Sequence, residues 1–102
     1  MTYLTITWSN LCQGEKQHHE LYLPATIGRG QGNDLRLDHP LVSRHHVRIE
    51  LDGTGIVLRD MQSRNGVLLD GRKLSYLRIV GPTWVRIGPF SLCISPSLPK
   101  SH

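Results

Sequence analysis

Residues 41–51 read LVSRHHVRIEL and join two different patterns. From Val47 onward apolar and polar residues alternate, which puts Val47, Ile49 and Leu51 on one side of an extended chain and predicts a β-strand. A polar cluster comes directly before this strand: Ser43, Arg44, His45 and His46. Four interpretations of the cluster are open, namely a catalytic pair, a metal site, an anion clamp or a polar turn.

Short alternating runs recur along the rest of the chain, whereas no long segment has the apolar spacing of an amphipathic helix. The sequence therefore predicts an all-β fold, a β-sandwich of two antiparallel sheets. The strands are expected at 3–8, 19–23, 25–29, 35–37, 46–51, 56–60, 67–69, 77–80, 83–87 and 90–95. The core is expected to join the apolar side of residues 46–51 to residues of other strands: Val57, Val85 and Ile87. Turn dipeptides separate the runs, among them Asp52-Gly53, Asn65-Gly66, Asp70-Gly71 and Gly81-Pro82.

The 102 residues suffice for one domain with a modest core. We expect this domain at residues 1–95, with 96–102 as a Ser/Pro-containing tail or linker, and a larger parent protein is compatible with such a tail. No apolar run approaches the ~20 residues of a membrane helix, and the N-terminus lacks the features of a signal peptide. Two solitary cysteines, Cys12 and Cys93, favour a reducing, cytoplasmic setting. The default expectation is a monomer.

The formal net charge of +4 favours an anionic partner without identifying it. Catalysis by Ser43 with a neighbouring histidine is disfavoured, because the sequence shows neither a nucleophile elbow nor an orienting acid. Metal binding is disfavoured as well, since adjacent histidines on a strand point to opposite faces. We therefore expect no enzyme activity, no metal and no cofactor.

Two further segments carry polar groups at strand ends. The stretch IGRGQGND, residues 27–34, offers glycine amides and Arg29, but strand-like alternation follows it where a nucleotide-binding loop would need a helix. A plain structural turn is about equally compatible with it. Asn65-Gly66 is by default a hairpin turn, and Ser63 and Arg64 add a hydroxyl and a cation beside it.

In combination, Gly28-Arg29, Ser43-x-x-His46 and Asn65-Gly66 resemble the signature of the forkhead-associated (FHA) domain, a module that reads phosphothreonine peptides. The resemblance covers roughly residues 3–95 and includes LRLDHPLVSRHHVRI, VLRDMQSRNGVLLDG and WVRIGPFSLCI. It implies a β-sandwich of about eleven short strands with binding loops at one end. One departure is Val67, which stands where the family often has threonine after Asn-Gly.

The resemblance also implies a role for each matching residue. Arg29, Ser43 and Arg44 would bind the phosphate. Asn65 would bind the main chain of the peptide, and Arg64 would face the phosphate or the peptide. Three residues would support the loops without touching phosphate: Gly28, His46 and Gly66.

The expected partner is thus a protein or peptide that contains phosphothreonine, in Ser/Thr-kinase signalling. One alternative is a scaffold that keeps the sandwich but binds partners without phosphate. Another is weak nucleic-acid binding through the basic surface. The aromatic residues give that second alternative no support, because burial is the default for Trp8, Trp84 and Phe90 in core-like strands. Neither nucleic acid nor a membrane is an expected partner.

Overall fold

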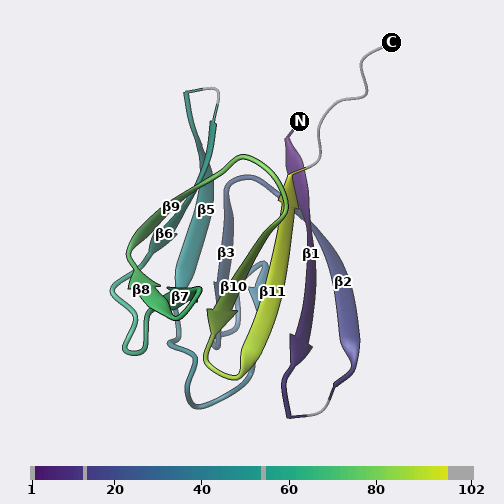
Figure 1. The fold of residues 1–102 in the computed structure, drawn as a ribbon, viewed down its shortest axis with the longest axis vertical. Coiled ribbons are helices and arrows are strands. Elements are labelled where there is room, and N and C mark those ends of the chain that lie inside the picture. Colours follow the sequence, from purple (N-terminus) through teal and green to yellow (C-terminus); the bar gives the residue numbers. More distant parts are fainter. Residues whose placement is uncertain (1, 13, 54, 97–102) are drawn as a thin grey trace.

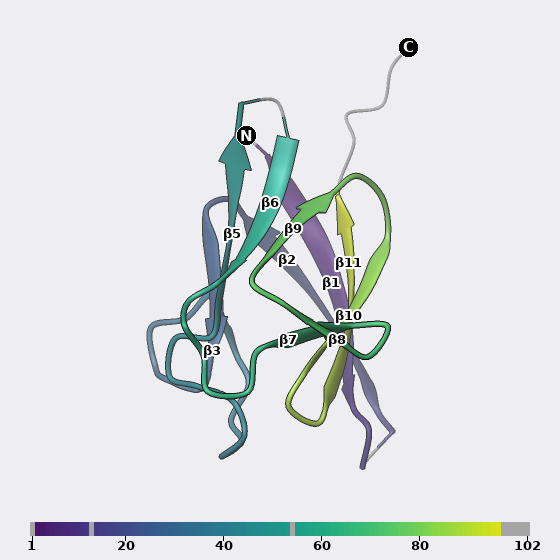
Figure 2. The same cartoon turned by 60° about the vertical axis from the view of Figure 1, so that its left-hand side comes forward.

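The structure is a computed structural model that describes residues 2–12, 14–53 and 55–96. These residues form a sandwich of two β-sheets (Figures 1 and 2), as the sequence predicted. No helix of the described part is long and apolar enough to cross a membrane. The strands are β1 (Tyr3–Asn10), β2 (Lys16–Tyr22), β3 (Ala25–Gly28), β4 (Leu35–Arg36), β5 (Val47–Asp52), β6 (Gly55–Asp60), β7 (Val67–Leu69), β8 (Arg72–Leu74), β9 (Tyr76–Ile79), β10 (Thr83–Ile87) and β11 (Phe90–Pro96).

One sheet has six strands in the order β2-β1-β11-β10-β7-β8, and the other has five in the order β4-β3-β5-β6-β9. The pairings are antiparallel except for β3 with β4, which run parallel. Ten of the strands correspond to predicted ones, and β8 was missed because its three residues, RKL, carry little apolar alternation. The expected tail at 96–102 lies outside the described residues, apart from Pro96 at the end of β11.

The core lies between the two sheets and takes every second residue of the central strands. Buried side chains come from both sheets: Leu4, Ile6, Ile27, Ile49, Leu58, Val85, Ile87, Leu92 and Ile94. The predicted packing around β5 was wrong at Leu51 and differs in its partners at Val57. Leu51 is 49% exposed, because it stands near the β5–β6 hairpin beyond the packed part of the sandwich. Val57 of β6 is fully buried, as expected of a core residue. It pairs with Glu50, however, and so lies on the side of its sheet away from the main core cluster, which Ile56 and Leu58 join.

Two other expectations fail for topological reasons. Trp84 is 55% exposed, since Val85 and Ile87 of the same strand point inward and alternation turns Trp84 outward. The Asn65-Gly66 pair is no two-residue hairpin, because β6 and β7 belong to different sheets and residues 61–66 cross between them. A tight hairpin of that kind occurs instead at Asp70-Gly71, where both residues have positive φ, 51° and 78°.

Candidate functional site

Three loops meet at the end of the sandwich opposite to the β5–β6 hairpin (Figure 1). They are residues 29–34 after β3, residues 37–46 before β5 and residues 61–66 after β6. Backbone hydrogen bonds join them: the Arg29 amide donates to the Ser43 carbonyl (2.9 Å), and the Met61 amide donates to the His46 carbonyl (2.9 Å). The loops therefore form one connected surface on which residues far apart in the sequence lie side by side.

His46 is fully buried between these loops. Its Nδ1 accepts a hydrogen bond from the Ser43 amide (3.0 Å), and its Nε2 lies 2.8 Å from the Gly66 carbonyl oxygen. An amide can only donate and a carbonyl can only accept, so the ring must be neutral with its proton on Nε2. One side chain thus connects the loop before β5 to the loop after β6.

Two glycines allow the loops to approach so closely. A Cβ at Gly28 would overlap the carbonyl oxygen of Arg44, so glycine is needed there for contact between backbones. Gly66 has φ +74°, which favours glycine, and the side chain of Lys73 occupies the space that a Cβ would need. Both positions matched the sequence signature.

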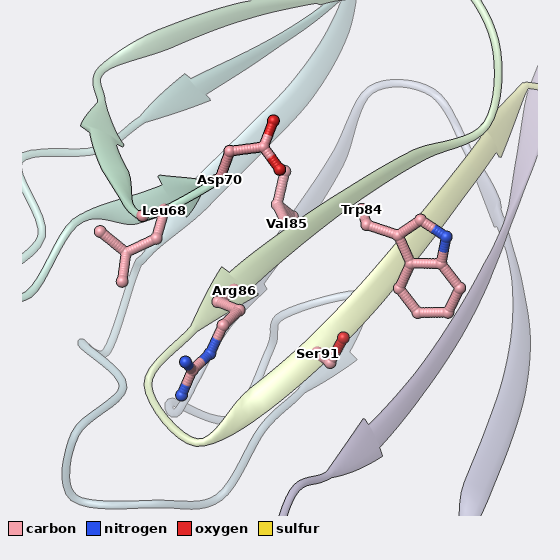
Figure 3. A pocket seen from close by; sticks show the side chains of 7 residues that line it. Leu68, Asp70, Trp84, Val85, Arg86 and Ser91 are labelled. Atoms are coloured by element: carbon pink, nitrogen blue, oxygen red, sulfur yellow. The ribbon is translucent and has the colours of Figure 1, made fainter.

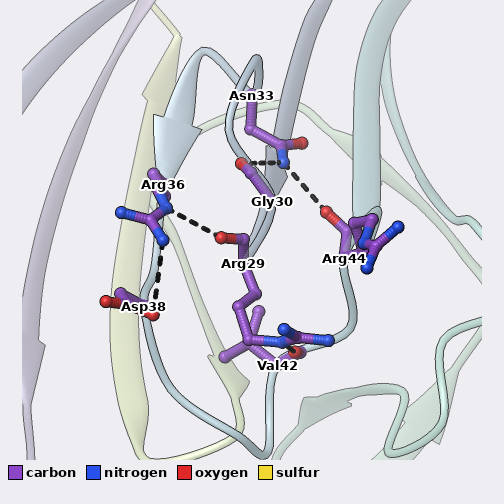
Figure 4. Close-up of polar contacts among 7 residues, drawn as sticks. All are labelled: Arg29, Gly30, Asn33, Arg36, Asp38, Val42 and Arg44. Carbon is purple, nitrogen blue, oxygen red and sulfur yellow. Dashed lines mark hydrogen bonds and ion pairs between the residues drawn. The ribbon is translucent and has the colours of Figure 1, made fainter.

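Arg29 is half-buried, and its Nε donates to the Val42 carbonyl at 3.0 Å (Figure 4). Its own carbonyl accepts from Nε of Arg36 at 2.8 Å. Ion pairs within the described residues involve Arg36, Arg48 and Arg59, and none involves Arg29. A neutral acceptor therefore orients the Arg29 guanidinium without cancelling its charge.

Ser43 follows Val42 directly. Its Oγ accepts a hydrogen bond from the Arg64 amide at 2.9 Å. The bond uses a lone pair of the oxygen, so the hydroxyl proton can still be donated to a ligand. The bond from the Arg29 amide to the Ser43 carbonyl holds the two residues together. Each side chain keeps at least one donor that these hydrogen bonds do not use.

The remaining signature residues line the same loops. Asn65 is exposed, and its Nδ2 donates to the Leu41 carbonyl at 2.8 Å. The exposed side chain of Arg44 packs against Gly30, and its carbonyl accepts from the Gly30 amide at 3.1 Å. Arg64 is exposed as well.

Sequence reasoning missed two polar supports of the loops. Nδ2 of Asn33 donates to the carbonyls of Gly30 (2.7 Å) and Arg44 (2.9 Å), which ties the first two loops together. Asp60 accepts from the amide and hydroxyl of Ser63, while the Ser63 Oγ accepts from the Gly66 amide (2.9 Å). The Asp-x-x-Ser spacing is typical of such a local turn and could have indicated the second support.

The geometry does not assemble a serine-hydrolase pair, because His46 bonds the amide of Ser43 and not its hydroxyl. His45 is exposed and lies outside this network. Among the described residues, no group of three His, Cys, Asp or Glu side chains could hold a metal ion. The chemistry available at the loops is therefore that of hydrogen-bond donors and uncompensated cations.

The comparisons with known proteins agree with this architecture. The model of the FHA domain matches residues 25–88. The transcriptional regulatory protein EmbR of Mycobacterium tuberculosis is 51% identical over 41 residues, which are 40% of this chain and 11% of EmbR. The FHA domain-containing protein FhaA of the same organism is 34% identical over 62 residues, 61% of this chain and 12% of FhaA. The chain thus matches a small part of these curated relatives.

Solved structures match over nearly the whole chain. The crystal structure of FHA-1 of M. tuberculosis Rv1747 has a TM-score of 0.77 and 26% identity, and covers 95% of this chain and 98% of that one. A structure from an analysis of phosphothreonine-dependent FHA domain interactions has a TM-score of 0.81 and 26% identity, with coverage of 97% and 100%. The family match, the sandwich and the loop residues lead to one conclusion: the chain belongs to the FHA domain family.

Proposed function

We propose that this FHA domain binds protein segments that contain phosphothreonine, with Arg29 and Ser43 as the core of the phosphate clamp. One observation carries the proposal. The side chain of Arg29 is fixed by the Val42 carbonyl next to Ser43, and within the described part of the chain it has no carboxylate partner. A dianionic phosphate is the complement of such a cation.

Each clamp residue has a distinct task. Arg29 presents its terminal amino groups to two phosphate oxygens, because its Nε–H is already used by Val42. Ser43 donates its hydroxyl proton to a third oxygen, while the Arg64 amide holds the Ser43 oxygen in place. Arg44, exposed beside Gly30, adds a second guanidinium.

Asn65 and Arg64 bind the main chain of the peptide next to the phosphothreonine. The Asn65 amide keeps one N–H and its carbonyl oxygen free after bonding Leu41, so it can donate to and accept from a peptide backbone. Such contacts read the position of the peptide and not its sequence. Gly28, His46 and Gly66 act indirectly, by holding the loops at the separation that a phosphate needs.

Relatives support this function. EmbR has been solved in complex with a low-affinity phosphopeptide, and the FhaA FHA domain in complex with the intracellular domain of Rv3910. By likeness to these modules, this domain is a non-catalytic recruiting unit in Ser/Thr-kinase signalling that uses no cofactor. A cytoplasmic setting fits such a reader of kinase products.

The experiment compares four peptides that differ at one residue: phosphothreonine, phosphoserine, glutamate and unmodified threonine. Their common flanks are chosen from a phosphothreonine peptide library screened against the domain. We expect phosphothreonine to bind about 10- to 200-fold more tightly than phosphoserine, because its γ-methyl stiffens χ1 and fills a small apolar niche. Glutamate should bind barely, since it has one charge and two coplanar oxygens.

A short single-stranded RNA serves as the control for a generic basic surface, and all titrations use one fixed salt concentration. Equal affinity for phosphothreonine and unmodified threonine would exclude the clamp. Preference for RNA over every peptide would assign the basic surface to nucleic acid instead.

A further inference from the structure

The six-stranded sheet carries a cavity of about 350 Å³ on its outer face, away from the core (Figure 3). Its walls come from three strands and a turn: Leu68 of β7, Asp70 of the β7–β8 turn, Trp84 and Arg86 of β10, and Ser91 of β11. None of these residues belongs to the phosphate clamp. The volume lies at the lower end of the roughly 300–1,000 Å³ typical of ligand pockets.

The sheet register explains why this face is hollow. Arg86 pairs with Ser91 on one side and with Leu68 on the other, so these three side chains form a row across β7, β10 and β11. Trp84 lies two residues away along β10, on the same face. Ser91 is the smallest side chain of the row and leaves space between the indole and the guanidinium (Figure 3).

Trp84 is the most unusual member of this face. It is 55% exposed, although the inner face of the same strand is fully apolar at Val85 and Ile87. Large aromatic side chains and arginines on a concave surface are the residues that contribute most to protein–protein binding.

The charges next to the cavity favour an acidic partner. Arg86 and Lys73 flank Leu68 on the two neighbouring strands, because Lys73 pairs with Leu68 across β8 and β7. Ion pairs within the described residues involve neither of these cations. The lining itself balances one cation, Arg86, against one carboxylate, Asp70. The positive surplus comes from Lys73 beside the lining, whose side-chain stem lies against Gly66.

We propose that this face, consisting of Leu68, Lys73, Asp70, Trp84, Arg86 and Ser91, docks an extended acidic segment of a partner protein without phosphate. An apolar side chain of that segment occupies the cavity against Trp84 and Leu68. A following carboxylate pairs with Arg86 or Lys73. An apolar wall beside two cations suits such a segment, which carries apolar and acidic side chains next to each other. This docking surface goes beyond the proposed phosphothreonine function and does not depend on it.

The test is a titration of the ¹⁵N-labelled full chain with the peptide acetyl-Gly-Leu-Glu-Glu-Gly-amide, followed by NMR. Two control peptides replace both glutamates by glutamine or the leucine by glycine. We expect saturable shifts of the Trp84 indole N–H and of the Leu68 and Arg86 amides. Removing either kind of side chain from the peptide should weaken binding about 5- to 30-fold.

Matched variants locate the binding. Arg86→Gln and Trp84→Ala should each weaken the wild-type peptide about 5- to 30-fold, whereas Arg78→Gln, on the other sheet, should leave the affinity unchanged. Arg86→Gln removes the charge of an exposed residue and keeps a polar side chain, so it remains informative even if Trp84→Ala fails to fold.

Three results would overturn the proposal: no saturable shift around Trp84 at millimolar peptide, equal binding of the glutamine control, or shifts confined to the Arg29 and Ser43 loops. The last result would mean that the acidic peptide uses the phosphate clamp. Because the probe carries no phosphate, its failure leaves the phosphothreonine function standing, and the reverse also holds.

Discussion

The arginines of the loops and those on the outer face of the five-stranded sheet have opposite surroundings. Arg48 and Arg59 share Glu50, with Nε···O distances of 3.0 and 2.7 Å, and the Arg59 guanidinium lies 5.1 Å from the centre of the Tyr76 ring. Arg29, in contrast, donates to the carbonyl of Val42. The first pair is neutralised in part by its own sheet, whereas the loop arginine is oriented but keeps its full charge.

This difference between the arginines shows how a fold can orient a cation without a carboxylate partner, so that its charge stays available to a ligand. Side-chain hydrogen bonds from Arg48 and then Arg59 lower the pKa of Glu50, a sign that the carboxylate and the two cations stabilise one another. A backbone carbonyl orients a guanidinium without such neutralisation. The loops are also braced by a neutral group, His46, whose two ring nitrogens bond Ser43 and Gly66. A neutral brace adds no charge that would compete with a phosphate.

The largest expected effect is the loss of this neutral brace. His46→Ala leaves a buried amide and a buried carbonyl without partners and opens a cavity, so we expect a loss of about 2–4 kcal/mol in the free energy of unfolding. Urea denaturation measures it. Gly66→Val should cost about 1–3 kcal/mol for a related reason, strain at positive φ. Urea midpoints equal to that of the wild type would show that His46 and Gly66 do not stabilise the loops.

The next effect separates the two kinds of arginine. Arg29→Ala should weaken the phosphopeptide about 10- to 100-fold, since a charge-assisted hydrogen bond contributes roughly 1.5–3 kcal/mol. Arg59→Ala is the matched control and should leave the affinity unchanged. Calorimetry with one library-selected phosphopeptide gives both values. Similar losses of affinity in the two variants would mean that general surface charge drives binding. Arg29 and Arg59 would then not differ in their roles.

Ser43→Ala removes the hydroxyl but keeps the charge of the clamp. We expect a weakening of about 10-fold, because one neutral donor to a charged acceptor is lost. The unfolding midpoint should stay near that of the wild type, since the Arg64 amide that loses its acceptor is solvent-accessible. An unaltered affinity would place the phosphate elsewhere on the loops.

The smallest expected effect is that of replacing Glu50, which pairs with Arg48 and Arg59 on the outer face of the five-stranded sheet. The pKa of Glu50 is lowered in the folded state, so its stabilising contribution is present above the unfolded pKa and is lost as the pH falls through the folded pKa. Glu50→Gln should therefore be slightly less stable than the wild type at pH 6, and this difference should be smaller at pH 3. Thermal unfolding at the two pH values checks this. A difference that grows toward pH 3 would contradict the assigned direction.

Alternation in the sequence predicted the fold well, because buried residues alternate with more exposed ones along most of β10 and β11 and over the first four residues of β1. Alternation was less informative where the type of a residue and its place in the alternating pattern favour opposite faces of the sheet. Trp84 was expected inside because burial is the default for a tryptophan in a core-like strand, although the inward positions of Val85 and Ile87 require it to point outward. Turn chemistry at Asn65-Gly66 likewise predicted a hairpin, since a local signal does not reveal that the flanking strands belong to different sheets.

In the candidate site, too, some residues could be predicted from sequence patterns and others depend on contacts in the folded chain. The residues proposed to face the ligand come from the family signature, in which spacing is specific. The supports at Asn33 and Asp60 act through backbone carbonyls and amides of residues that only the folded chain brings near. A single sequence contains no pattern for contacts of that kind, with the exception of the short Asp60 to Ser63 turn.

The most direct test of the clamp is an NMR map of the ¹⁵N-labelled chain, titrated first with a degenerate phosphothreonine peptide pool and then with the same pool after dephosphorylation. We expect the phosphorylated pool to shift the amides of residues 29–30, 42–44 and 64–66 and the side-chain amide of Asn65. The dephosphorylated pool should leave these signals in place. Equal shifts with both pools, or shifts confined to the outer sheet faces that carry Arg59 or Trp84, would contradict the claim that the loops form a phosphate clamp.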